Sequence, residues 1–330
     1  MNGAGMSGAS EQLLEELRPA AFAIAYRMLG SVAEAEDVVQ EALLRLHRVL
    51  DAGEQIESPR AYLATVTTRL SIDELRSARA RREQYVGEWL PEPIVTDPES
   101  DPAREAEMAD SLSLAMLVLL ESLSPEQRAV LLLRDVFDYP YAEVAEILGK
   151  GEAAVRQLAA RARRHVEARR PRFEARRRER DELARRFFAA ARSGEVKALE
   201  ALLAQDVVLH GDGGGKVPAL GRSLHGRGRV ARTLLAWVRQ GARVPGAALR
   251  PAEVNGQPGA VLLVDERVIG VWSLDISDGQ VQAIRSIVNP DKLRHLGPVG
   301  DMRAALARRE RSPRLGGSWS PRLGGSGRRG

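Results

Sequence analysis

Residues 141–166 read YAEVAEILGKGEAAVRQLAARARRHV, and this stretch has the spacing of a helix-turn-helix. Such a motif needs a small residue where its two helices cross, a glycine at the turn and an apolar residue that seats the second helix. Ala145, Gly149 and Val155 supply these three features at the usual relative spacing. Taken alone, the stretch is also compatible with an ordinary pair of helices in a bundle.

The second predicted helix of this stretch has an arginine-rich outer face. In a DNA-binding helix-turn-helix the second helix enters the major groove, where arginine reads guanine, glutamine reads adenine and flanking arginines contact phosphates. We therefore predict that this face contacts DNA through four residues: Arg156, Gln157, Arg161 and Arg164.

Charge is segregated along the chain, although the formal net charge is only +4. Residues 60–82 carry net +4 and residues 152–180 carry net +7, whereas residues 83–110 between them carry net −8. Two segments are therefore suited to polyanions, and one could imitate a polyanion. Because solvated helix faces are commonly charged, the charge pattern alone does not decide for nucleic acid.

Length and composition exclude several classes of protein. The 330 residues are enough for two or three separate cores. The absence of cysteine excludes a disulfide framework, a thiol nucleophile and a cysteine-based zinc site. The first ten residues lack the pattern of a signal peptide, and no apolar run approaches the roughly 18 residues of a membrane-spanning helix. We therefore expect a cytoplasmic protein with no membrane contact.

Two further parts of the chain have recognisable patterns. Residues 13–82 read as helices, since Ser31 and Glu34 have the spacing of a capping box and are followed by an apolar stripe of helical period. Residues 244–254, 259–265, 267–277 and 280–288 read as strands, and Asp278-Gly279 predicts a hairpin turn between the last two. Residues 181–297 are therefore expected to form an α+β domain with a curved antiparallel sheet.

The chain as a whole resembles a bacterial sigma factor of the extracytoplasmic-function (ECF) type. The similarity rests on AEDVVQEA (35–42) and SPRAYL (58–63) in sigma region 2, and on LSPEQR (123–128) and YAEVAEILG (141–149) in region 4. Three further strings resemble signatures of the ECF subgroup with a fused SnoaL-like domain: YVGEWLPEP (85–93), DGGGK (212–216) and NPDKL (289–293).

This resemblance implies a multidomain chain with two all-α sigma domains, namely the region 2 helical bundle and the region 4 helix-turn-helix, and an α+β SnoaL-like cone-shaped domain. The expected division is a flexible N-terminus (1–10), sigma region 2 (11–82), an acidic linker (83–110), region 4 (111–170), a basic linker (171–180), the SnoaL-like domain (181–297) and a disordered basic tail (298–330).

The resemblance also implies partners and site residues. Asp37, Gln40 and Glu41 match positions that bind the β′ clamp helices of core RNA polymerase, and their i, i+3, i+4 spacing places them on one helix face. Region 4 is expected to contact the β flap and promoter DNA. The residues assigned to the minus-ten element are Arg60, Tyr62, Arg69, Arg76 and Arg79, of which Tyr62 is equally compatible with a core position.

The third domain is expected to regulate the sigma regions in place of a separate anti-sigma factor. In this hypothesis it folds back on the two sigma domains, its two signature loops lie near the linker, and the molecule is biased between closed and polymerase-competent forms. The interdomain residues are Trp89, Pro91, Asp212, Lys216, Asn289, Asp291 and Lys292.

Other functions of the third domain remain open at this point. Asp206, His210, Asp212 and Asp275 are candidates for acid–base work, although their spacing is not diagnostic of an enzyme. An unidentified small ligand is a second possibility, and contact with protein is favoured. We expect no metal, no cofactor and no enzyme activity. The alternative for the whole chain is a one-component helix-turn-helix regulator with a ligand-binding or enzymatic SnoaL-like domain, which has no need of region 13–82.

Overall fold

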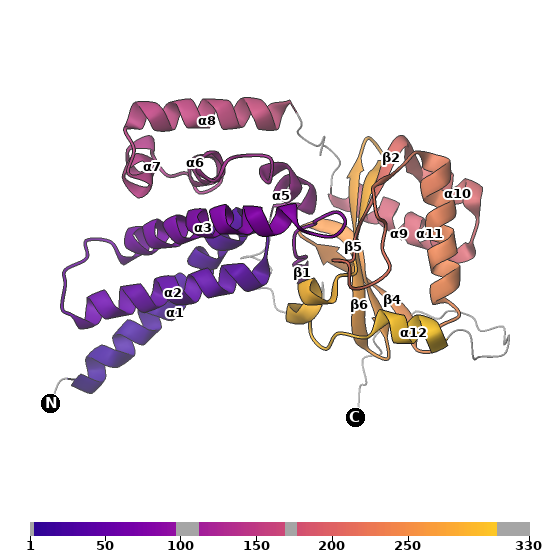
Figure 1. The fold of residues 1–330 in the computed structure, drawn as a ribbon, viewed down its shortest axis with the longest axis horizontal. Helices are drawn as coiled ribbons and strands as arrows, with labels where there is room; N and C mark the ends of the chain where they lie inside the picture. The colour runs from indigo at the N-terminus through magenta and orange to yellow at the C-terminus, as the bar shows by residue number, and fades with distance from the viewer. Residues whose placement is uncertain (1–2, 97–111, 169–176, 309–330) are drawn as a thin grey trace. The chain divides into compact units, whose positions relative to one another are not determined.

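The computed structural model describes residues 3–96, 112–168 and 177–308, and the side chains of residues 3–10 and 78–83 fall outside this description. These residues belong to two compact units (Figure 1). The first unit contains the helices before Tyr85 and those between residues 112 and 168. The second unit contains residues 85–96 together with residues 177–308. Each unit is described by itself.

The regular structure of the first unit, over its described residues, is all α-helical, as the sequence predicts. Its helices are α1 (Gly3–Leu29), α2 (Val32–Asp51), α3 (Pro59–Glu83), α5 (Leu114–Leu120), α6 (Pro125–Asp135), α7 (Tyr141–Leu148) and α8 (Glu152–Glu167). The hydroxyl of Ser31 accepts a hydrogen bond from the backbone N–H of Glu34 and so caps α2, and Ser124 and Gln127 form a complete capping box at α6. These local signals fix where the two helices begin.

The turn between α7 and α8 has the geometry that the helix-turn-helix pattern predicts. Gly149 ends α7 in the left-handed conformation, with φ at 62°, which a residue with a side chain adopts only at a cost. Ala145 and Val155 are buried in one apolar cluster with Val130 of α6. The short side chain of Ala145 lets the helices approach, and Val155 seats α8.

The second unit is built on a seven-stranded sheet with the order β1-β4-β5-β6-β7-β2-β3. The strands are β1 (Val95–Thr96), β2 (Leu203–Asp212), β3 (Leu224–His225), β4 (Ala247–Val254), β5 (Gln257–Val264), β6 (Arg267–Ser277) and β7 (Gln280–Ile287). Neighbours are antiparallel except β2 and β7, which are parallel. Register shifts in β5–β6, β6–β7 and β2–β7 mark irregular positions that bend a sheet.

Three helices cover one face of this sheet: α9 (Arg177–Ser193), α10 (Val196–Leu202) and α11 (Arg227–Gly241) (Figure 1). Their apolar sides and the sheet enclose one core, to which Phe187, Leu234, Trp272 and Ile284 contribute. Because side chains alternate along a strand, the residues between the core positions face the opposite side of the sheet. That side includes His210 and Asp212 of β2.

The last described residues belong to the second unit. A 3₁₀ helix, η1 (Pro290–Leu296), follows β7, and α12 (Met302–Arg308) ends the described chain. Val299 bridges to Val268 of β6, and Ala305 of α12 is 2% exposed. None of the helices in the described ranges is long and apolar enough to cross a bilayer.

The structure corrects four expected boundaries. The N-terminus is helical from Gly3 instead of flexible, and α9 begins at Arg177 inside the expected basic linker. The expected acidic linker is bound to the second unit over residues 85–96. The expected disordered tail is folded over residues 298–308, because Met302, Ala305 and Leu306 form an apolar helical stripe. Residues 97–111, 169–176 and 309–330 lie outside the described residues.

Candidate functional site

One face of α2 carries the three residues expected to bind polymerase. Asp37 and Gln40 are exposed, whereas Glu41 is half-buried and accepts a hydrogen bond from Nε of Arg45 at 2.8 Å. Leu44 lies one turn further on the same face and is 42% exposed. The sequence analysis missed Leu44, although an apolar residue outside the buried stripe of α2 was the available signal. The face therefore combines acidic, amide and apolar groups.

The arginines of α3 contact the segment that contains the helix-turn-helix. Arg69 donates from Nε to the carbonyl of Ile147 at 2.8 Å and from Nη2 to the carbonyl of Glu146 at 3.1 Å. These carbonyls end α7, where a helix carries partial negative charge. Arg69 therefore supplies a matching cation to the C-terminus of the first helix of the motif.

Arg76 makes a second contact of this kind. Its guanidinium bonds to the carboxylate of Glu126 in α6 at 2.6 Å and to Asp73 at 3.2 Å. The hydrogen bond to Glu126 raises the pKa of Arg76. Partial burial alone would raise the pKa of Glu126, but the hydrogen bond from Arg76 outweighs it and leaves that pKa below its usual range.

The remaining minus-ten candidates differ in their surroundings. Arg60 lies beside Tyr139, whose pKa is raised by burial against the opposing effect of the guanidinium. Tyr62 is half-buried. Arg79 lies on α3, but its side chain falls outside the described residues.

A buried arginine joins α6 to α1. Arg128 is 1% exposed; its Nε donates to the carbonyl of Arg27 at 3.1 Å, and its Nη1 bonds to Glu121 at 2.5 Å. Burial lowers the pKa of Arg128 to about 9. Burying a charged group requires compensating partners, so this arginine ties the two helical segments together. The sequence analysis missed Arg128 as a buried contact, although it ends the string LSPEQR (123–128).

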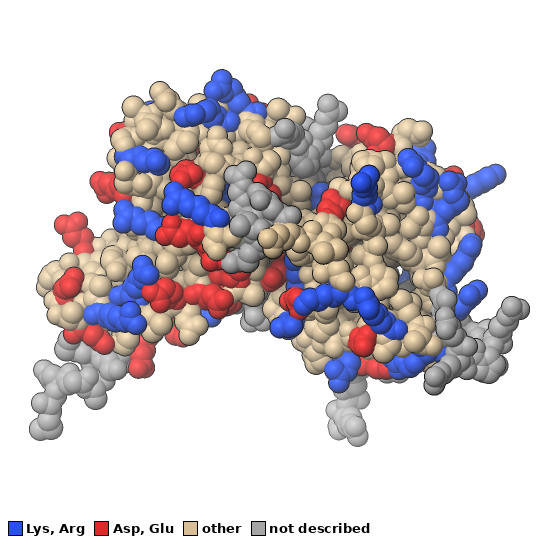
Figure 2. Space-filling view, in the orientation of Figure 1, with Lys and Arg blue, Asp and Glu red and all other residues tan. Residues whose placement is uncertain are grey.

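The four residues predicted to contact DNA through α8 are all exposed. Arg156 pairs with Glu152 and lies over the ring of Tyr141 at 4.5 Å. By contrast, Arg163 on another side of the helix bonds to Asp135 at 2.9 Å. Figure 2 shows lysine and arginine side chains gathered over α8. The arginine-rich outer face thus keeps its basic groups at the surface.

The second unit holds residues 85–96, which we name the linker strand, through the fully buried carboxylate of Asp212. Oδ1 accepts hydrogen bonds from the hydroxyl of Tyr85 at 2.5 Å and from the backbone N–H of Gly214 at 3.1 Å. Oδ2 accepts from the backbone N–H of Leu90 at 2.9 Å and from Nζ of Lys292 at 2.7 Å. One carboxylate therefore joins the linker strand to both signature loops.

Lys292 completes this centre. Its side chain is 7% exposed and also donates to the carbonyl of Leu90. Its ammonium lies 4.2 Å from the ring centre of Trp89 and 4.9 Å from that of Tyr85, within range of cation–π attraction. Burial, together with the hydrogen bond to Asp212, raises the pKa of Tyr85. The phenol therefore stays protonated as a donor.

The glycines of the DGGGK loop (212–216) allow this loop to lie close to the NPDKL loop (289–293). Gly214 has a φ of 58°, and a β-carbon there would lie 2.6 Å from Cγ of Asn289. Asn289 in turn donates from Nδ2 to the hydroxyl of Tyr85 at 2.8 Å. The loop thus fits against the NPDKL loop. Lys216 and Asp291 add an ion pair at the surface, with side chains 54% and 39% exposed.

The rest of the linker strand is held by edge pairing and further polar contacts. Ile94 exchanges hydrogen bonds of 2.9 Å with Asn255, and Val95 pairs with Val254 to extend the sheet. Pro91 is buried, and Nε2 of His295 lies 2.8 Å from the carbonyl oxygen of Pro93. The expected extended linker is therefore an integral part of the second unit over residues 85–96, and it joins the sheet as β1 at Val95–Thr96.

A polar triplet lies at the start of the linker strand. Glu88 bonds to Nδ1 of His210 at 2.6 Å and accepts from the hydroxyl of Ser223 at 2.9 Å. Burial alone would raise the pKa of Glu88, but the hydrogen bond and charge of His210, helped by Ser223 and Arg285, hold it below 4.5. Glu88 and Ser223 had not been singled out, because 135 residues separate them.

The four acid–base candidates do not form one site. Asp206 is exposed, His210 contacts Glu88, Asp212 binds the linker strand and Asp275 pairs with buried Arg285. Among the described residues no three His, Asp or Glu side chains are grouped as metal ligands would be.

We predict that Lys292→Met destabilises the second unit by about 3–5 kcal/mol, because it leaves the buried carboxylate of Asp212 without its cation. The matched substitution Lys216→Met removes an exposed partner and is expected to cost less than about 1 kcal/mol. Urea unfolding followed by tryptophan fluorescence measures both, since the three tryptophans among the described residues, Trp89, Trp237 and Trp272, belong to the second unit. Equal losses would contradict the role given to Asp212.

We also predict a pH dependence that comes from Glu88. Its pKa is lower in the folded chain than the ordinary 4.5, so its ionised form stabilises fully above that pH and progressively less as the pH falls below it. The stability difference between wild type and Glu88→Gln should therefore shrink on acidification below about pH 4.5. Glu182→Gln, at an exposed pair with Arg185, is the control. A difference that stays constant with pH would contradict this prediction.

Comparisons with known proteins match both sigma regions of the chain. The Sigma-70 region 2 family model matches residues 13–81, and the Sigma-70 region 4 model matches residues 113–166. ECF RNA polymerase sigma factor SigJ of Mycobacterium tuberculosis is 40% identical over 312 residues, covering 91% of this chain and 98% of the relative. Probable ECF RNA polymerase sigma factor SigI of the same species is 33% identical, covering 82% and 90%.

A solved structure agrees over most of the chain. The crystal structure of Mycobacterium tuberculosis SigJ matches with a TM-score of 0.69 at 36% identity, covering 86% of this chain and 98% of that one. The matched share extends well beyond the two sigma regions and so includes much of the second unit, which is the SnoaL-like domain. The chain therefore belongs to the ECF RNA polymerase sigma factors and carries a fused C-terminal SnoaL-like domain.

Proposed function

We propose that this sigma factor directs core RNA polymerase to its promoters, and that its SnoaL-like domain controls this activity by holding the linker strand. The observation that carries the proposal is the buried Asp212, whose carboxylate accepts hydrogen bonds from Tyr85 and Leu90 of the linker strand. A domain that only accompanied the sigma regions would not need a buried charge satisfied by their linker.

The face of α2 supports polymerase binding. Asp37, Gln40 and Glu41 are assigned to the β′ clamp helices, and we add Leu44 as an apolar contact at the same face. Exposed apolar residues surrounded by polar groups are typical of protein contact surfaces. Region 4 is assigned to the β flap. Since core polymerase is cytoplasmic, we place the protein there.

The arginines support promoter binding in two steps. The exposed set on α8 is assigned to the major groove at the minus-thirty-five element. The set on α3, together with Tyr62, is assigned to the minus-ten element, but Arg60, Arg69 and Arg76 contact the region 4 segment in this structure. We infer that the described first unit is a closed form, and that these contacts exchange for phosphate contacts on promoter binding.

The length of the linker strand connects its binding by the SnoaL-like domain to the separation of sigma regions 2 and 4. Residues 85–96 lie between region 2 and region 4, and twelve residues at about 3.4 Å each give roughly 40 Å of reach. While these residues are held on the sheet, that reach is not available to separate the two regions. Release of the linker strand would restore that reach.

A one-component regulator is the less favoured function. Such a regulator has no need of a sigma region 2, yet the region 2 model matches residues 13–81. The proposed control also requires no catalysis in the SnoaL-like domain.

We predict that Asp37→Ala/Gln40→Ala/Glu41→Ala weakens binding to core polymerase by about tenfold or more, as loss of central contact residues does in other interfaces. The control is Glu54→Ala/Gln55→Ala/Glu57→Ala, which likewise removes two carboxylates and one amide, from exposed positions after α2. Its affinity should stay within about twofold of wild type, because these residues lie outside the proposed face. Fluorescence anisotropy with labelled sigma factor measures both, and equal affinities for the two variants would refute the assignment.

We further predict that Lys292→Met raises promoter-specific transcription per bound polymerase several-fold, because it frees the linker strand. Lys216→Met should leave transcription near the wild-type level. The measurement is run-off transcription with saturating full-length sigma factor, which separates this effect from polymerase affinity. Unchanged transcription by a Lys292→Met protein whose tryptophan fluorescence differs from that of wild type would overturn the proposed control.

A further inference from the structure

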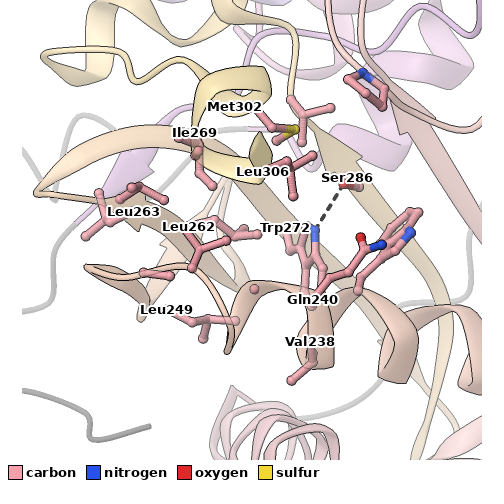
Figure 3. Close-up of a pocket in the computed structure, with 18 of the residues that line it drawn as sticks. Val238, Gln240, Leu249, Leu262, Leu263, Ile269, Trp272, Ser286, Met302 and Leu306 are labelled. Carbon is pink, nitrogen blue, oxygen red and sulfur yellow. Dashed lines mark hydrogen bonds between the residues drawn. The ribbon is translucent and has the colours of Figure 1, made fainter. Parts of the chain in front are cut away.

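The SnoaL-like domain contains a cavity of about 280 Å³. Neither the sigma regions nor the linker strand contributes to its lining. It lies between the C-terminal end of α11, strands β4 to β6 and α12 (Figure 3). Trp237, Leu262, Ile269 and Trp272 are among the residues that line it. The cavity is therefore on the helix-covered face of the sheet, whereas Asp212 and the linker strand are on the other.

The lining carries no charged side chain, although 28% of the residues of the chain are charged. Its polar side-chain groups are those of Gln240 and Ser286 and the indole N–H groups of Trp237 and Trp272. The hydroxyl of Ser286 already accepts a hydrogen bond of 3.0 Å from Nε1 of Trp272. Gln240 extends toward the cavity from the end of α11 (Figure 3) and is left to orient a bound molecule.

We propose that this cavity is a binding site for an uncharged, mainly apolar small molecule of about two fused rings. The charge follows from the lining, since an ion buried there would have no partner and would pay a large desolvation cost. The size follows from comparison, because an apolar cavity of about 150 Å³ holds benzene, and this one has roughly twice that volume.

Helix α12 closes one side of the site. Met302, Ala305 and Leu306 follow helical spacing and face the cavity, so the helix presents its apolar stripe to the ligand. Ala305 packs in a cluster with Val244 and Val264, and Arg308 pairs with Asp265 at 2.8 Å. The segment first expected to be disordered therefore supplies a wall of the site.

The lining residues bind and do not catalyse. Asp206, His210, Asp212 and Asp275 are absent from the lining, and none of the lining side chains titrates near neutral pH. Acid–base chemistry on a bound molecule therefore has no group to perform it. This separates the site from an enzyme pocket and fits a domain that senses a molecule.

The direct test is equilibrium dialysis of the full-length protein with radiolabelled naphthalene and, separately, with naphthalene-1-sulfonate. The two probes share ring size and differ in charge. We expect saturable binding of one naphthalene per chain, and at least about tenfold weaker binding of the sulfonate, because its charge has no partner in the lining. No saturable binding up to the solubility of naphthalene, or equal binding of the two probes, would overturn the proposal.

Matched variants locate the site. Leu262→Trp fills the cavity, and Ala236→Trp adds the same side chain at an exposed position of α11 outside the lining. We expect at least about tenfold loss of naphthalene affinity for the first and less than about twofold for the second. Leu306→Trp fills the cavity from α12 instead, in case Leu262→Trp alters folding, which thermal unfolding reports. Full naphthalene affinity in a folded Leu262→Trp or Leu306→Trp protein would place binding elsewhere.

Discussion

The carboxylate of Asp212 is completely withdrawn from water, and this single group determines how the second unit is assembled. A buried carboxylate is tolerated only when its charge and its lone pairs are matched. Here the backbone of Gly214 and the ammonium of Lys292 supply two donors, and Tyr85 and Leu90 supply two more. Half of the compensation therefore comes from a segment that, in sequence, belongs between the sigma regions. Removing that segment exposes an uncompensated charge, so water must replace the lost donors.

The first unit also contains a buried charged side chain that is compensated by its partners, but here the charge is positive. Arg128 is buried and is matched by Glu121 and by the carbonyl of Arg27. Arg69 and Arg76 add more exposed contacts between α3 and the segment that contains the helix-turn-helix. Exposed ion pairs contribute little stability individually, so these contacts are easily exchanged, whereas the buried arginine is not. The first unit thus combines the buried contacts of Arg128, which are costly to break, with several exposed contacts that phosphate groups can displace.

Local patterns in the sequence predicted much of the fold. The turn at Gly149, the capped start of α2 and the hairpin at Asp278-Gly279 depend on residues within a few positions of one another, and each is found where expected. Strand β2 is not among the strands that the sequence predicts, because its partner β7 lies more than 70 residues away and parallel pairing leaves no local signal. Helix α12 was missed because the repeated glycine-rich sequence after it dominated the composition.

The candidate site divides in the same way. Two signature loops and Trp89 were singled out from the resemblance, and the structure brings these segments together around Asp212. Tyr85, Glu88, Leu90 and Ser223 were not singled out as site residues, because their contacts cross more than 120 residues of sequence. The net charge of residues 83–110 can be counted from the sequence. It does not show which strand edge pairs with the linker or which buried group binds it.

The parallel pair β2–β7 has a consequence for how this domain can change. Gly211 and Ser286 are paired and face the cavity, whereas their neighbours His210 and Arg285 are paired and face the linker strand. A one-residue insertion or deletion within residues 207–212 would exchange the two faces, since side chains alternate along a strand. A change in the length of this strand would therefore alter the cavity wall and the surface that binds the linker strand at the same time.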